Sequence, residues 1–151
     1  MTDTPVTESP VTDGPGVADY PLAETRPDTV RALSGRRMSE ITLDAVLAGG
    51  VTMDDLRIDA GALRAQASIA RAAGRETLAR NLERGADLVA VPQEVVMATY
   101  DLLRPGRARD EAELLAAARR LRDEYGAATI AAFVEEAAEV YARRGLFRFR
   151  F

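Results

Sequence analysis

A run of alanine, leucine and isoleucine over residues 63–75 limits most strongly what this chain can fold into. The stretch reads LRAQASIARAAGR, and its helix-favouring residues place apolar side chains on nearly every side of a helix. The exception is one thin polar line at helical spacing, formed by Arg64, Ser68, Arg71 and Arg75. A helix with so much apolar surface is buried on more than one face. Neighbouring helices of the same chain or a surface of another protein could cover it, and the residues alone leave both open.

Similar helical signals continue to residue 144. Asp59 is placed to cap a helix that Gly74 interrupts, and we predict one long, kinked helix over residues 59–90. Beyond it, apolar residues at helical spacing define two more helices, and Gly126 lies between them. These residues are Leu114, Ala118, Leu121 and Tyr125 on the first helix, and Ile130, Phe133, Val134, Ala137 and Tyr141 on the second. The pattern predicts an antiparallel helical hairpin over about residues 110–144.

Shorter helices are predicted on either side of the long one. Thr42 is the expected N-cap of the sequence TLDAVL, which Gly49 ends, and Thr52 with Asp55 reads as a capping box. Pro92 suits the first position of a further helix. Only the terminal FRFRF resembles a strand, and its phenylalanines could either make a contact or fray.

The fold class that follows is all-α: a small irregular helical domain with an extended N-terminal arm and a C-terminal antiparallel helical hairpin. Residues 1–18 have the Thr, Pro, Asp and Gly composition of a disordered tail. Residues 19–151 are predicted to form a single helical domain. The arm at 19–27 begins DYPLAETRP, and its tyrosine could lodge in a groove or pack on its own domain.

Composition excludes several functions. The 151 residues contain no cysteine and no histidine, so the usual metal ligands and the usual general base at neutral pH are missing. A net charge of −4 argues against nucleic acid as a partner. No apolar run approaches the ~20 residues that cross a bilayer, so no membrane association is expected. The first residues lack the pattern of a signal peptide.

No catalytic, cofactor-binding or metal-binding residue is predicted. The adjacent acids Asp54–Asp55 and Glu135–Glu136 would point about 100° apart on a helix and could not converge on one substrate atom. We interpret both pairs as solvated helix faces or partners of a helix N-terminus. The serines Ser34 and Ser68 have no histidine to activate them.

Several motifs together closely resemble the small (gamma) subunit of adenosylcobalamin-dependent diol and glycerol dehydratases. They are DYPLA, TLDAVL, VTMDDLRI, LRAQASIARAAGRETLARNLERGADL, YDLLRPGR and AAFVEEAAEVYARR, in this order, from about Asp19 to about Arg144. Two departures from the family are Gly106, where an aromatic residue is usual, and Gly85, where alanine is usual.

The resemblance implies a subunit of a lyase that is a heterohexamer of large (alpha), medium (beta) and small subunits. Such a complex converts 1,2-propanediol, glycerol or ethanediol to the aldehyde and water by radical chemistry that adenosylcobalamin starts. The family places the cofactor, metal and substrate on the partner subunits and assigns no catalytic residue to the small one. The expected location is the bacterial cytoplasm, with a microcompartment lumen reached only through partner subunits.

We therefore predict a non-catalytic subunit that docks on the large subunit and supports assembly. The expected contact residues come from the arm and from the alanine-rich helix: Tyr20, Pro21, Leu22, Arg64, Ile69, Arg71 and Arg75. The alternative is a free-standing helical interaction or regulatory module. An enzyme active on its own is the third and weakest interpretation.

Overall fold

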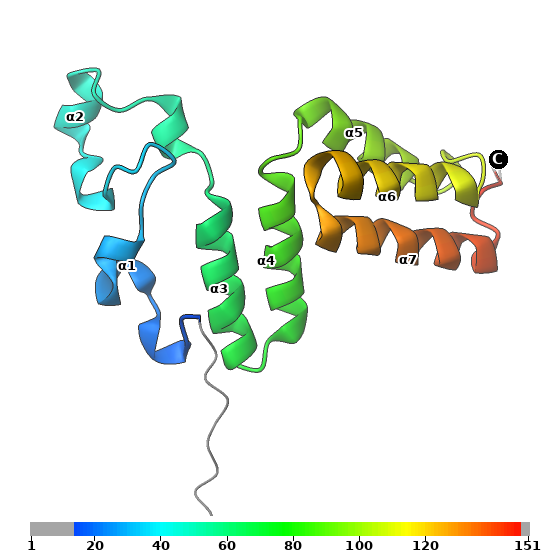
Figure 1. Ribbon diagram of the computed structural model, residues 1–151, viewed down its shortest axis with the longest axis horizontal. Helices are drawn as coiled ribbons and strands as arrows, with labels where there is room; N and C mark the ends of the chain where they lie inside the picture. The colour runs from blue at the N-terminus through cyan, green and yellow to red at the C-terminus, as the bar shows by residue number, and fades with distance from the viewer. Residues whose placement is uncertain (1–13, 149–151) are drawn as a thin grey trace, which may run out of the picture.

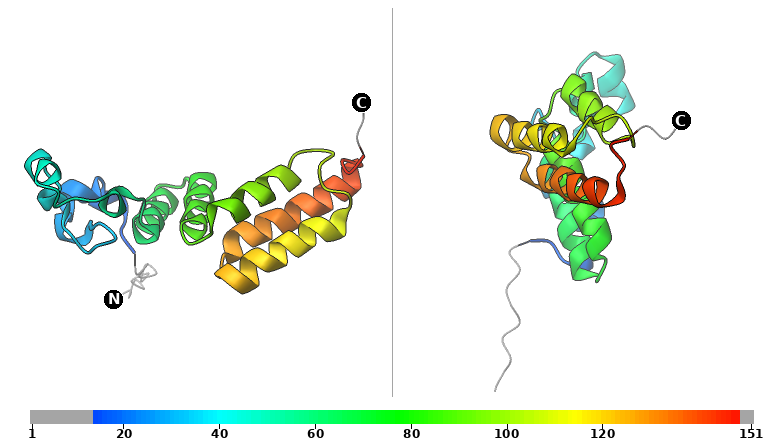
Figure 2. Two further views of the ribbon diagram at one scale, coloured as in Figure 1. Left: turned by 90° about the horizontal axis from the view of Figure 1, so that it is seen from above. Right: turned by 90° about the vertical axis from the view of Figure 1, so that its right-hand side faces the viewer.

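The computed structural model describes residues 14–148, which form an elongated chain of helices (Figures 1 and 2). The short elements come first: η1 (Val17–Asp19), α1 (Leu22–Thr25), η2 (Pro27–Thr29), η3 (Met38–Glu40), α2 (Leu43–Leu47) and η4 (Met53–Leu56). The longer helices are α3 (Ala60–Ala72), α4 (Glu76–Leu88), α5 (Gln93–Leu102), α6 (Glu111–Tyr125) and α7 (Ala128–Arg144). No strand occurs among the described residues, which confirms the all-α prediction.

Most helix ends lie where the capping residues predict. The side chains of Thr42 and Asp59 accept hydrogen bonds from the amides of Ala45 and Ala62, at 3.2 Å and 2.8 Å. The hairpin of α6 and α7 is also confirmed, with Gly126 in the left-handed region at φ 64° after α6. These boundaries depend on local chemistry, which the sequence shows directly.

The long kinked helix predicted over residues 59–90 is wrong. Two separate helices, α3 and α4, run antiparallel and side by side (Figure 1). Gly74 adopts φ +73°, and the amides of Gly74 and Arg75 donate to the carbonyls of Arg71 and Ala70, which is the pattern of a Schellman motif. A glycine inside a helical pattern can kink the helix or reverse the chain, and here the left-handed conformation reverses it.

Small side chains hold α3 against α4. Ala67, Ala70 and Ala79 are buried between the two helices, and Leu82 packs beside them. Alanine allows two helix backbones to approach closely, so this seam needs no large side chain. The alanine-rich sequence that looked excessive for one small core is thus partly used within the hairpin itself.

A second, larger core lies in the C-terminal lobe, which we define as α5, α6 and α7. Leu114, Leu121 and Val134 are its largest fully buried side chains. Alanines at the helix contacts complete it, among them Ala118 and Ala131. The hydrophobic interior of the described residues is therefore divided between the α3–α4 seam and the C-terminal lobe.

Residues 145–147, which follow α7, pack against the C-terminal lobe. The Tyr141 hydroxyl donates a hydrogen bond to the carbonyl of Leu103, and the amide of Gly106 donates to the carbonyl of Leu146 at 2.8 Å. Phe147 packs on the core and lies 5.9 Å from Tyr141 between ring centroids. This phenylalanine of the FRFRF ending makes a contact, while residues 149–151 lie outside the described residues.

Asp87 of α4 joins the two parts of the molecule. Its Oδ2 accepts hydrogen bonds from the amides of Thr129 and Ile130, at 2.7 Å and 3.3 Å, in the first turn of α7. Its Oδ1 lies 3.6 Å from a guanidinium nitrogen of Arg64 on α3. The carboxylate thus caps α7 from another element and also neutralises part of the positive end of that helix.

Replacing Gly85 by alanine is expected to stabilise the chain by about 0.5–1 kcal/mol, because glycine within a helix costs about that much relative to alanine. A Cβ at this position would lie 3.7 Å from Cδ1 of Leu63, which is an ordinary contact. Thermal unfolding measures the change. Gly126→Ala is the matched control and should destabilise, since alanine is strained at φ +64°; a loss of stability in Gly85→Ala would contradict the expectation.

Candidate partner-binding surfaces

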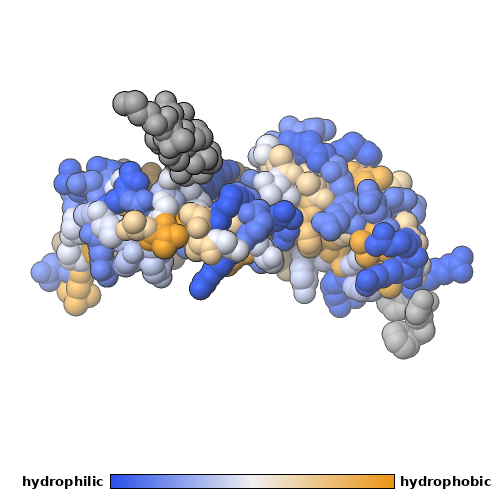
Figure 3. Space-filling view, turned by 90° about the horizontal axis from the view of Figure 1, so that it is seen from below, coloured by the Kyte–Doolittle hydropathy of each residue, from blue (hydrophilic) through white to orange (hydrophobic). Residues whose placement is uncertain are grey.

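Residues 30–58 expose an unusual number of large apolar side chains, and we name them the exposed apolar segment. Its exposed large hydrophobics are Leu33, Met38, Leu43, Val46, Leu47, Met53, Leu56 and Ile58. Leu43 and Leu47 are the most open of those on α2, at 72% and 77% exposed. The space-filling view in Figure 3 shows apolar surface at the end of the molecule that carries α1 and α2. A surface of this kind marks a site of association.

Polar contacts, rather than apolar packing, connect the parts of the exposed apolar segment to one another. Asp55 is buried, accepts a hydrogen bond from the Ser34 hydroxyl and caps η4 through the amide of Thr52 at 2.9 Å. Hydrogen bonds from Ser34 and Thr52 lower the pKa of Asp55. The predicted capping box of Thr52 and Asp55 is confirmed. Of the two interpretations of Asp54–Asp55, Asp55 fits a partner of a helix N-terminus. It does not lie on a solvated face, because its side chain is buried.

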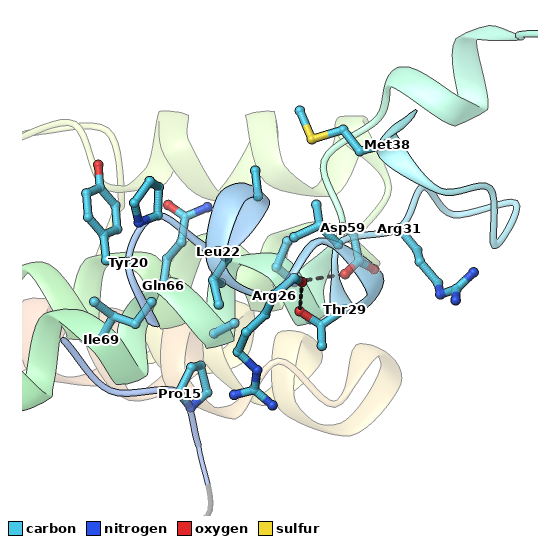
Figure 4. Close-up of a pocket in the computed structure, with 16 residues that line it drawn as sticks. Pro15, Tyr20, Leu22, Arg26, Thr29, Arg31, Met38, Asp59, Gln66 and Ile69 are labelled. Carbon is cyan, nitrogen blue, oxygen red and sulfur yellow. Dashed lines mark hydrogen bonds between the residues drawn. The ribbon is translucent and has the colours of Figure 1, made fainter. Parts of the chain in front are cut away.

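A groove of about 620 Å³ separates the arm from α3 (Figure 4). Tyr20, Pro21 and Leu22 line its arm side, and Gln66 and Ile69 line its α3 side. Pro15, four residues before the arm, is held on α3 because its carbonyl accepts a hydrogen bond of 2.9 Å from the Ser68 hydroxyl. The arm includes short helical turns and is not extended throughout. Residues 14–18 of the predicted tail lie in this described region, and residues 1–13 lie outside it.

The apolar members of the predicted interface have unequal access to a partner. Tyr20 is 68% exposed, and Pro21 and Leu22 are half-buried. Ile69 is only 8% exposed, at the floor of the groove. The face of α3 that carries Ile69 is therefore largely covered by the chain's own arm, while Tyr20 remains open for contact with another molecule.

The arginine line on α3 is largely used within the chain. Arg71 forms ion pairs with Glu83 and Glu76 of α4, at 2.9 Å and 3.0 Å. Hydrogen bonds that the Arg71 guanidinium donates to the carboxylates of Glu83 and Glu76 raise the pKa of Arg71. Arg64 reaches Asp87, and Arg75 is exposed at the turn between the helices. Both α4 and the arm thus cover parts of α3, which favours the covering of this helix by its own chain.

A second, shallower groove of about 550 Å³ lies along α3 and α4. Ile58 at the end of the exposed apolar segment lines it together with Leu63, Gly85 and Val89. Apolar surface therefore continues from residues 30–58 onto α3 and α4. This continuity makes one extended candidate contact region of the N-terminal half of the molecule.

The described residues contain no group of three or more Asp or Glu side chains that could hold a metal ion. Glu135 forms a two-pronged ion pair with Arg122, with oxygen to nitrogen distances of 2.5 Å and 2.8 Å, and Arg122 lowers the pKa of Glu135. Glu136 beside it is exposed. Glu135 therefore ties α6 to α7, while Glu136 faces solvent. The two carboxylates point in different directions, as neighbouring residues on a helix do.

The folded chain is expected to have a constant melting temperature between about pH 6 and 8, because histidine and cysteine are both missing. Stability should fall below about pH 4.5. The pKa values of three glutamates are lowered: Glu76 by Arg71, Glu113 by the amide and guanidinium of Arg109, and Glu135 by Arg122. A folded pKa below the unfolded one gives stability that is present above the unfolded value and lost as pH falls through the folded value. Calorimetry across pH checks this, and a midpoint that moves between pH 6 and 8 would contradict it.

The sequence profile described as "Dehydratase small subunit" matches residues 16–148. The chain belongs to the dehydratase small-subunit family. It is similar to the propanediol dehydratase small subunit of Salmonella typhimurium strain LT2, at 47% identity over 128 residues, which cover 85% of this chain and 73% of the relative. The propanediol dehydratase small subunit of Citrobacter freundii is 43% identical over 141 residues, which cover 93% and 81%.

Membership of the dehydratase small-subunit family confirms the resemblance found in the sequence, and a small subunit implies partner subunits. Sequence reasoning did not identify residues 30–58 as an exposed surface. The signal was present, since TLDAVL and TMDDLRI are rich in large apolar residues and too short to bury them in a helical pair. It also missed Asp87, whose hydrogen-bond partners lie more than 40 residues away in the sequence.

Proposed function

We propose that this chain is the non-catalytic small subunit of an adenosylcobalamin-dependent diol or glycerol dehydratase, a heterohexamer of large, medium and small subunits. The complex removes water from 1,2-propanediol, glycerol or ethanediol and releases the aldehyde. The chain docks on the large subunit and supports assembly of the holoenzyme. The relatives named propanediol dehydratase small subunit support the choice of substrate class.

The exposed apolar segment carries this proposal. Fixing the backbone of one residue costs about 1–2 kcal/mol, which folded domains offset by burying apolar side chains. Between Gly14 and Gln66, Asp55 is the single buried side chain of the described residues. The segment therefore lacks an apolar interior that would stabilise it. A partner surface can provide one, and each large apolar side chain that it buries contributes about 1.5–3 kcal/mol of stabilisation.

The described residues do not fit adenosylcobalamin as a bound group. The larger groove, at about 620 Å³, has the volume of a site for a drug-sized ligand, and a corrinoid with its nucleotide loop and adenosyl group is considerably bigger. Apolar side chains dominate the groove around the arm. The proposal therefore places the cofactor, the metal and the substrate on the partner subunits and assigns no step of the reaction to this chain.

The proposed location is the bacterial cytoplasm, or the lumen of a microcompartment reached through the partner subunits. Among the described helices, none combines the length and the apolar character that crossing a membrane requires. No role with nucleic acid is proposed, in line with the net charge of −4.

Co-expression with candidate large and medium subunits tests the proposal. We expect the three chains to co-purify and to convert 1,2-propanediol to the aldehyde only when adenosylcobalamin is added. A monomer indifferent to those partners would contradict the proposal and favour a free-standing interaction or regulatory module. Activity of the purified single chain would contradict the non-catalytic role.

A further inference from the structure

We propose that residues 30–58 fold only when the chain docks on its partner subunit, so that folding of this segment and assembly are one event. In the free chain the segment is an unfolded loop, held at one end by the arm on α3 and at the other by the start of α3. The inference rests on the proposed function where it names a dehydratase subunit as the partner. Its claim about the free chain is independent of that name.

The first argument is the absence of an apolar interior among the described residues of this segment. Neither η3 nor α2 contains a buried residue, and Asp55 is the one buried residue of η4. Helices of three to five residues are not stable in water on their own and depend on packing against other elements. Here the side chains that would pack, such as Leu43 and Leu47, point into solvent.

The second argument is the pattern of polar contacts. Ser34 bonds to Asp55, and a guanidinium nitrogen of Arg36 donates to the carbonyl of Gly50 at 2.6 Å, so these bonds close on the segment itself. The ion pair of Arg37 with Asp28, at 3.5 Å, reaches only η2, next to the arm. No hydrogen bond or ion pair found among the described residues joins the segment to α3 through α7. Unfolding of this segment therefore breaks few polar contacts with the rest of the chain.

The flanking elements are held differently. Pro15 is bonded to Ser68 on α3, and Ile69 is buried beneath the arm. The seam of α3 with α4 and the core of the C-terminal lobe bury their own apolar side chains. The structure thus consists of a self-supporting body with a loop fixed at both ends, placed beside the second groove that Ile58 lines. Because both ends of the segment are fixed, it has fewer conformations to sample before it folds on the partner.

A partner that completes this segment must present an apolar surface. The segment would lose conformational entropy when it folds on that surface. Part of the docking free energy therefore offsets the cost of folding, as in coupled folding and binding. The unassembled chain would also expose arginines in an unfolded loop, namely Arg31, Arg36, Arg37 and Arg57. A protease could then remove small subunits that have no partner, while assembled ones are protected.

Hydrogen exchange followed by mass spectrometry, on the full chain alone and in the co-purified complex, tests the inference. In the free chain we expect amides of residues 43–57 to exchange within about tenfold of the unfolded rate, and amides of α6 and α7 far more slowly. In the complex the first group should slow by at least about 100-fold. Limited trypsin digestion should cut the free chain first after Arg36, Arg37 or Arg57, and should spare these bonds in the complex.

Asp55→Asn provides a second measurement. If the segment is unfolded in the free chain, loss of this buried carboxylate leaves the melting temperature of the free chain unchanged and weakens the complex. Protection of residues 43–57 in the free chain comparable with that of α6, or a lower melting temperature of the free Asp55→Asn chain, would overturn the inference and leave the proposed function standing. Failure of the three chains to co-purify would instead contradict the proposed function.

Discussion

Replacing both Leu43 and Leu47 by glutamine is expected to weaken binding to the partner subunits by roughly 30- to 900-fold. Burial of a leucine side chain contributes about 1.5–3 kcal/mol, and most of each side chain is exposed in the isolated chain, at 72% and 77%. The pair therefore accounts for roughly 2–4 kcal/mol of binding. Glutamine keeps helix propensity close to that of leucine, so the change acts mainly on apolar contact. Titration of the labelled chain with the purified partner subunits gives the dissociation constant.

The matched control is Met97→Gln, on α5 of the C-terminal lobe, which is also exposed, at 55%. We expect it to change binding by less than about threefold, since Met97 lies outside the contact region of the N-terminal half. The melting temperature of the free chain should be unchanged in both variants, because the substituted side chains are already in water. Unaltered affinity of the double variant would show that residues 30–58 do not form the contact.

Asp87→Ala is expected to lower the free energy of unfolding by about 2 kcal/mol and the melting temperature by about 4–8 °C. The substitution leaves the amides of Thr129 and Ile130 without their acceptor at the start of α7, where Asp87 is only 9% exposed in its side chain. Loss of a helix cap costs up to about 2 kcal/mol, and a half-buried amide without a partner adds to that cost. Thermal and urea unfolding of the purified chain measure the effect.

Asp87→Asn separates capping from charge. Asparagine keeps an oxygen that can accept the two amide bonds, so about half of the loss should be recovered. Glu136→Ala is the control for removing an exposed carboxylate from α7, and its effect should stay within about 0.5 kcal/mol. Equal stability of Asp87→Ala and Glu136→Ala would show that the contact between α4 and α7 does not stabilise the molecule.

The predicted interface shows how far single residues could be assigned from the sequence. The polar line on α3 is real, but Arg71 is occupied by glutamates of α4, and the apolar face next to it is covered by the arm at Ile69. Helical spacing shows which residues share a face. It does not show which neighbour covers that face, because α4 reaches Arg71 only through the reversal at Gly74.

The sequence by itself determined where most helices begin and end, and the family. Caps such as Thr42, Asp59 and Gly126 act within a few residues, and the family motifs are contiguous, so local chemistry suffices for both. Only the tertiary structure decided that α3 and α4 form a hairpin, that Asp87 caps α7, and that residues 30–58 lack an interior. Each of these depends on which distant segments lie together, and that choice reflects the summed burial of many side chains more than any local signal.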